Sequence, residues 1–239
     1  LRFPYNTQAA LGVWRALFFT PGAPPPEPTQ TAEYNRGAYL VNGLGHCTAC
    51  HTPRNALGAT SDAKAFTGGL IPVQNWYAPA LNAAHEAGVK EWKTDDVVAL
   101  LTTGVAPQGS VLGPMAEVVF RSTQHLSDAD ARAMAVYLQA LPQQEHKALA
   151  AGAAPPASAL ARGAKVYEQH CAQCHGDQGQ GEPDAFPALA GNRAVTLADP
   201  TNLVRVVLQG GYLPATAGNP RPHGMPPFQQ LLSDEDIAA

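Results

Sequence analysis

The feature that most constrains this chain is a pentapeptide of the form Cys-x-x-Cys-His, which occurs twice. The first copy runs from Cys47 to His51 and the second from Cys171 to His175. Together the two copies use all four cysteines of the chain. On a helix, residues three and four positions apart share one face, so both thiols and the imidazole of each copy lie on the same side. Each copy is therefore suited to hold one bound group at three points.

This pattern is typical of covalent attachment of c-type haem, in which the two thiols bond to the porphyrin and the histidine is an axial ligand of the iron. Cys-x-x-Cys pairs also occur in zinc sites and redox dithiols. A zinc ribbon needs its two pairs close together, and a thioredoxin-like site lies near a βαβ pattern, which this sequence lacks. We therefore predict two haems. The expected covalent anchors and proximal ligands are Cys47, Cys50, His51, Cys171, Cys174 and His175.

The segments around the two motifs repeat in the same order, which predicts two similar domains. A helix precedes each motif, a Pro-x-Leu segment and a loop with a methionine follow it, and a closing helix begins at Ser-Asp-x-Asp. We expect a linker at 1–30, a first domain at 31–147, a second linker at 148–157 and a second domain at 158–239. The closing helix of the second domain is expected to be incomplete at Ala239.

Two of the three methionines occupy equivalent loops of the repeat. Met115 and Met225 lie in Gly/Pro-rich segments just before the closing helices, and we expect their thioethers to be the distal iron ligands. His223 is the rival distal ligand of the second haem. Met134 falls on the apolar face of a predicted helix and is expected in the core.

Three further residues are expected to support the sites. A proximal histidine needs an acceptor for its second ring nitrogen, and the carbonyls of Pro79 and Pro187 in the Pro-x-Leu segments are good candidates. Arg54 follows the first motif directly. Its guanidinium either pairs with a haem propionate or is a solvated surface charge, and the sequence leaves both open.

An iron with both axial positions filled by protein has no open site for a substrate, so these sites predict electron transfer rather than catalysis. The catalytic motifs G-x-S-x-G and H-E-x-x-H do not occur in the sequence. The net charge of −4 argues against nucleic acid as a partner. No stretch reaches the roughly 18 consecutive apolar residues of a membrane span.

Four segments, 3–6, 35–41, 45–55 and 113–119, resemble the multi-haem cytochrome c subunit of bacterial membrane-bound dehydrogenases. The resemblance implies an all-α fold of two tandem class I cytochrome c domains, each built around a covalent haem c. It also implies a third haem domain upstream, with residues 1–30 following it. A membrane-holding tail at the C-terminus is common in the family but is not seen in this sequence.

The same resemblance implies a partner and a place. The partner is a catalytic dehydrogenase subunit of the quinoprotein, flavoprotein or molybdenum type, and ubiquinone or a terminal oxidase accepts the electrons. The implied location is periplasmic, at the outer face of the bacterial cytoplasmic membrane, so contact with the membrane surface is expected. Two alternatives remain open, a dihaem peroxidase-type enzyme and a stand-alone soluble dihaem electron shuttle.

Overall fold

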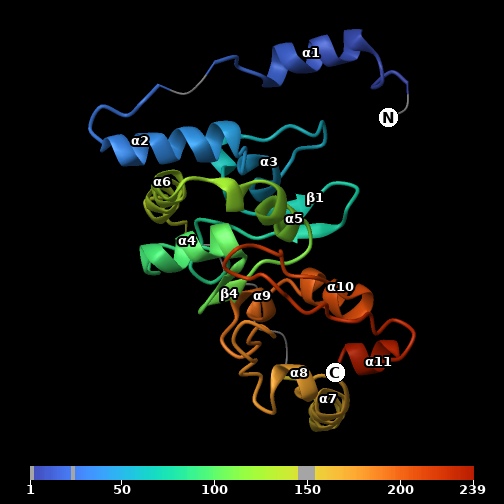
Figure 1. Cartoon of the computed structure of the whole chain (residues 1–239). Helices are drawn as coiled ribbons and strands as arrows, with labels where there is room; N and C mark the ends of the chain where they lie inside the picture. The colour runs from blue at the N-terminus through green and yellow to red at the C-terminus, as the bar shows by residue number, and fades with distance from the viewer. Residues whose placement is uncertain (1–2, 23–24, 145–153) are drawn as a thin grey trace.

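The computed structural model describes residues 3–22, 25–144 and 154–239. Figure 1 shows the chain in two tiers, with residues up to about 144 above and residues from 154 below. Helix α1 (Gln8–Phe18) lies apart from the upper tier and buries no residue. The indole N–H of Trp14 donates to the carbonyl of Leu57 at 2.9 Å, so this helix does contact the body of the protein. Within the described residues, no helix is long and apolar enough to cross a membrane.

The upper tier is organised by two crossing helices. Helix α2 (Ala32–Tyr39) is capped by Thr31 and continues as a π-helical turn, Leu40–Leu44. Helix α6 (Asp128–Gln139) is capped by the Ser127 hydroxyl, as the Ser-Asp-x-Asp pattern predicted. The two helices meet at Gly37, where the lack of a side chain lets the backbones approach closely.

Two more helices complete this core. Helix α4 (Thr94–Thr103) ends at Gly104, whose φ of +80° terminates the helix in a left-handed conformation. Helix α5 (Pro114–Arg121) begins with proline in its first turn. Short 3₁₀ turns lie at Asp62–Lys64 and Thr123–His125. The main apolar cluster comprises Leu40, Val41, Phe66, Val89, Trp92, Val97, Leu101, Met134, Ala135, Leu138 and Leu141.

The prediction of an all-α chain needs one correction, because two small antiparallel sheets interrupt the helices. Strands β1 (Gly69–Ile71) and β2 (Trp76–Ala78) pair with Leu70 opposite Tyr77. Strands β3 (Val105–Ala106) and β4 (Gly109–Ser110) form a second hairpin. Strands of two or three residues are too short to show an alternating apolar pattern, so no periodicity in the sequence indicated them.

The lower tier holds the second motif. Its helices are α7 (Ala157–His170), α8 (Ala172–His175), α9 (Arg193–Thr196), α10 (Thr201–Gln209) and α11 (Asp234–Ile237). Ser233 and Asp236 form a capping box at the start of α11. Among the described residues of this tier, Phe228, which is 9% exposed, is the only hydrophobic side chain that belongs to the buried core. The lower tier therefore builds a much smaller side-chain core than the upper one.

The two tiers meet through α9 and α10. The backbone N–H of Arg193 donates to the Gln108 carbonyl at 3.0 Å, and the Asn192 amide donates to the Ser110 hydroxyl at 3.0 Å. Most of the linker predicted at 148–157, and the end of the first domain predicted at 147, lie outside the described residues.

Candidate functional site

The first Cys-x-x-Cys-His motif forms a single helical turn, α3 (Thr48–His51). The His51 N–H donates to the Cys47 carbonyl at 3.0 Å, which closes the turn around the two cysteines. Cys47 is half-buried, Cys50 is exposed, and both are free thiols. Burial raises the pKa of Cys47 to about 11, so this thiol stays protonated at neutral pH. Across the described ranges, no group of three or more His, Cys, Asp or Glu side chains is arranged to hold a metal ion by itself.

The orientation of His51 is set by one hydrogen bond. Its Nδ1 lies 2.7 Å from the carbonyl oxygen of Pro79. A carbonyl only accepts, so Nδ1 carries the proton and Nε2 keeps its lone pair. Removal of water from the ring lowers the pKa of His51, which also favours the neutral form. His51 therefore has the tautomer and charge that an iron ligand requires.

The second motif repeats this arrangement in α8. His175 is 9% exposed, and its Nδ1 lies 3.0 Å from the carbonyl oxygen of Pro187. Cys171 is half-buried and Cys174 is exposed, as in the first motif, and burial raises the pKa of Cys171. The structure thus contains both of the histidine–proline hydrogen bonds that the Pro-x-Leu segments predicted.

The two loop methionines are both half-buried, on different elements. Met115 lies in the first turn of α5 and contacts both apolar clusters of the upper tier. Met225 pairs with Gly211 in a β-bridge. His223 is exposed, with its ring 4.8 Å from that of Phe186. The assignment of Met115 and Met225 as distal ligands stays a prediction, and Met134 is in the core as predicted.

Arg54 has a position that the sequence did not suggest. Its guanidinium donates to the carbonyls of Ala49 and Gly58, each at 2.7 Å. These bonds tie the turn that carries the first motif to the loop after it. Arg54 therefore supports the backbone of the first site through two direct contacts.

The residues at both motifs fit haem c. Each motif offers two free thiols on one helical turn and an imidazole whose Nδ1 is hydrogen-bonded to a carbonyl. This donor set matches thioether attachment together with one nitrogen ligand. In the lower tier, the aliphatic side chains of α10 are half-buried and available for apolar contact with a porphyrin.

Sequence reasoning missed the residues that hold the two Pro-x-Leu segments. Glu86 accepts from the Ala80 N–H at 2.7 Å and from the Tyr77 hydroxyl at 2.9 Å. Asn192 donates to the Ala188 carbonyl at 2.9 Å, and Asn202 bonds the backbone of Tyr77. The Asn192 side chain also caps α9. Of the roles described in this paragraph, only this capping could have been expected from the sequence, because asparagine is a preferred N-cap residue.

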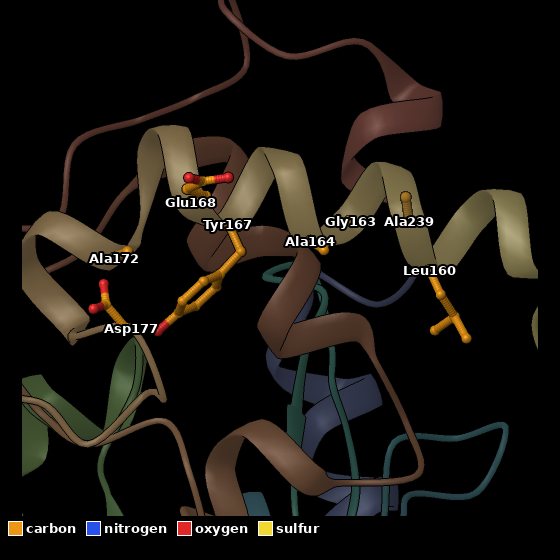
Figure 2. A pocket seen from close by; sticks show the side chains of 8 residues that line it. All are labelled: Leu160, Gly163, Ala164, Tyr167, Glu168, Ala172, Asp177 and Ala239. Carbon is orange, nitrogen blue, oxygen red and sulfur yellow. The ribbon is translucent and has the colours of Figure 1, made fainter.

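A groove runs along α7 on the lower tier. In Figure 2, Tyr167 extends toward Asp177 while Leu160 points away at the other end of the helix. In the upper tier the matching face of α2 is covered by α6, where the rings of Tyr34 and Tyr137 lie 5.2 Å apart. The groove contains none of the predicted site residues. It is lined by Leu160, Gly163, Ala164, Tyr167, Glu168, Ala172, Asp177 and Ala239.

Comparison with known proteins agrees with this geometry. Residues 158–239 match the family model described as cytochrome c oxidase, cbb3-type, subunit III. The whole chain is 41% identical to the cytochrome c subunit of a quinone alcohol dehydrogenase from Gluconobacter oxydans, of which it covers 52%. It is 33% identical to the fructose dehydrogenase cytochrome subunit of Gluconobacter japonicus, of which it covers 54%. It is also 42% identical over its full length to a nicotinate dehydrogenase subunit of Pseudomonas putida, covering 20% of that protein.

The chain thus spans about half the length of the cytochrome subunits it matches and a fifth of the nicotinate dehydrogenase subunit. The similarity extends over the entire chain, including the segments that hold the two Cys-x-x-Cys-His motifs. Together with the two bonded histidines and four free thiols, it places the chain among cytochromes that carry covalent haem c. Over its whole length, the chain is thus similar to cytochrome c subunits of dehydrogenase complexes, and residues 158–239 match a cytochrome c family model.

Proposed function

We propose that this chain is the electron-transfer part of a dehydrogenase complex and carries two haem c groups. Single electrons enter from a catalytic partner subunit, pass between the two sites and leave to ubiquinone or a terminal oxidase. The observation that carries this proposal is the pair of equivalent hydrogen bonds, His51 to Pro79 and His175 to Pro187. Each bond leaves one imidazole nitrogen free for iron beside two thiols.

The residues of each site have separate tasks. When bound, haem c supplies an iron that changes its oxidation state by one electron. The four cysteines would fix the cofactor to the chain, and His51 and His175 would each provide a nitrogen ligand to the iron. The carbonyls of Pro79 and Pro187 keep each imidazole in one tautomer and raise its basicity as a ligand.

Met115 and Met225 would each supply a thioether as the second protein ligand of one iron. A thioether stabilises ferrous iron, which raises the reduction potential and suits an electron acceptor. An iron held by both a histidine and a methionine would have no position open to peroxide or oxygen. His223 is exposed and lies against Phe186, so the contacts of the second site do not favour it over Met225.

We also propose that 31–147 and 158–239 are two cytochrome c domains, each enclosing its own haem. Matching contacts support this division. Gly37 lies against Ala133 and Gly163 against Ala239, at equivalent positions of the repeat. The ion pair of Arg36 with Asp130 likewise corresponds to that of Arg162 with Asp236.

The names of the relatives support the proposed partner, and covalent haem attachment supports the proposed location. Their names include a quinone-dependent alcohol dehydrogenase, a fructose dehydrogenase and a gluconate 2-dehydrogenase. The proposed partner is therefore a dehydrogenase subunit that oxidises an alcohol, a sugar or a related compound. Covalent haem attachment implies a site outside the bacterial cytoplasm, and we propose the periplasmic face of the cytoplasmic membrane.

The proposal is tested with the chain matured in a host that attaches haem c. A pyridine haemochrome assay on the denatured protein should find two covalently held haems, and a variant with Cys171→Ser and Cys174→Ser should retain one. The visible spectrum should be low-spin with a thioether-to-iron band at the far-red end. Absence of covalent haem contradicts the proposal. A high-spin ferric spectrum with rapid peroxide turnover supports the peroxidase-type enzyme instead.

Affinity purification from the native membrane distinguishes a subunit from a shuttle. A subunit should elute with a large dehydrogenase at a constant ratio, and substrate of that dehydrogenase should reduce both haems. A chain that purifies alone and is reduced by no co-purified enzyme is a soluble shuttle, which contradicts the proposed role as a subunit.

A further inference from the structure

Helix α10 of the lower tier is hydrogen-bonded to the upper tier through Asn202. This side chain is 7% exposed, and its amide makes two bonds to one residue of β2. Its oxygen accepts from the Tyr77 N–H at 2.9 Å, and its nitrogen donates to the Tyr77 carbonyl at 2.7 Å. A single side chain thus satisfies both backbone groups of Tyr77, as a neighbouring strand would do.

Tyr77 is two residues before Pro79, whose carbonyl orients His51. Glu86 holds the residues on both sides of this proline, because its carboxylate accepts from the Tyr77 hydroxyl and from the Ala80 N–H. Because Tyr77 and Ala80 are held by these hydrogen bonds, the Pro79 carbonyl between them has little freedom to move. The position of the acceptor of His51 therefore depends on Asn202, a residue of the other tier.

A second contact of α10 lies near Met115, the other residue expected to bind the first iron. Arg205 lies one turn after Asn202, with its guanidinium 4.9 Å from the centre of the Trp76 ring. Trp76 packs against Gly113, since a β-carbon on Gly113 would be 2.7 Å from the indole. Gly113 is two residues before Met115. One face of α10 is therefore in contact with the supports of both expected ligands of the first iron.

The other end of α10 is anchored in the second site. The N–H groups of Phe228 and Gln229 donate to the carbonyls of Val207 and Leu208 at 3.0 and 3.2 Å. Gly211, just after the helix, exchanges two backbone hydrogen bonds with Met225, at 3.1 and 2.8 Å. The helix is thus fixed at the expected distal ligand of the second site while its first turn bonds the first site.

We propose that Asn202 is a positioning residue for the first haem site, through which the second domain sets the hydrogen bond between Pro79 and His51. A hydrogen bond at Nδ1 makes the imidazole a stronger donor and stabilises ferric iron. Loss of the Asn202 contacts loosens Tyr77 and Pro79, weakens that bond and raises the midpoint potential of the first haem. This inference rests on the proposed function, because it requires haem at His51.

The test compares midpoint potentials of the haem-loaded full chain by spectroelectrochemical titration. Asn202→Ser removes both bonds and keeps a small polar group, and Asn202→Leu keeps the approximate shape. Each variant is expected to shift the midpoint potential of the first haem to a more positive value and to leave that of the second haem unchanged. Amide hydrogen exchange at Tyr77 should be faster in both variants. If only one of them folds, its midpoints decide the question.

Ser110→Ala is the matched control, because it removes the bond from Asn192 across the same junction and leaves α10 intact. Its midpoints should equal those of the unmodified chain. An equal shift in Ser110→Ala, or unchanged midpoints in a haem-loaded Asn202 variant, would overturn the role of Asn202. Absence of haem from the unmodified chain would instead contradict the proposed function.

Discussion

Gly37 lies so close to Ala133 that a β-carbon on Gly37 would collide with the Ala133 carbonyl oxygen. This contact sets the distance between α2 and α6, the two helices at the centre of the upper tier. The obstructing atom belongs to the backbone of α6, so it cannot move aside by changing a rotamer. Gly163 has the equivalent contact with Ala239, where a β-carbon would be 2.6 Å from the carbonyl oxygen.

Gly37→Ala should destabilise the protein by about 2–3 kcal/mol, because the helices must separate to admit the methyl group. Chemical denaturation followed by circular dichroism measures the change. Gly12→Ala is the control, since Gly12 lies inside α1 and a β-carbon there would have no atom within 4 Å. At that position the greater helix propensity of alanine should be neutral or stabilising, by up to about 1 kcal/mol. Equal destabilisation of both variants would contradict the close contact.

Asp130→Asn should lower the stability most at neutral pH. The hydrogen-bonded guanidinium of Arg36, 2.7 Å away, holds the pKa of Asp130 below its usual value. A carboxyl group whose pKa is lower in the folded state stabilises the protein above its unfolded pKa, and this contribution is lost as the pH falls through the folded pKa. The difference between the two proteins should therefore shrink in acid, as thermal unfolding at several pH values can measure.

Asp128→Asn serves as the control for that experiment. Asp128 is also an acidic residue in the first turn of α6, so it shares the favourable interaction with the helix dipole. In the described part of the chain no ion pair is seen for it. Its pH dependence should be weaker than that of Asp130→Asn, and an equal dependence would argue against the Arg36 pair as the cause.

Thr123→Val should cost about 1–2 kcal/mol of stability. The buried Thr123 hydroxyl donates to the Leu101 carbonyl at 2.5 Å, in the last turn of α4. Valine has nearly the same shape but leaves that carbonyl without its donor. Thr123→Ser keeps the hydroxyl and should retain more stability in urea unfolding. If the serine variant were less stable than the valine variant, packing of the methyl group would be the dominant contribution.

Met115→Ala and Met225→Ala should each remove about half of the thioether-to-iron band of the haem-loaded chain, because each thioether is the proposed ligand of one iron. Met134→Leu is the control, as Met134 is 3% exposed in the core and leucine conserves its volume. An unchanged spectrum in either loop variant would contradict that methionine as a ligand. At the second site, Met225→Ala is compared with His223→Ala, and the His223 variant should leave the band intact.

The sequence by itself determined the chemistry. Cysteines and histidine in one helical turn have few uses, so Cys47, Cys50 and His51 and their second copy predicted haem without any fold. The internal repeat located Pro79 and Pro187 as partners of the histidines, and capping patterns located the start of α6 at Ser127. These features depend on residues close together in the chain, and their spacing can be read directly from the sequence.

Only the tertiary structure decided how the two sites are joined. Asn202 looks like an ordinary polar residue in the first turn of a helix, and its partner Tyr77 lies 125 positions away in the chain. No sequence pattern indicated the strands β1 to β4 or the two carbonyl contacts of Arg54. Such contacts arise when segments far apart in sequence are packed together, and their hydrogen bonds are then fixed by the need to satisfy buried backbone groups.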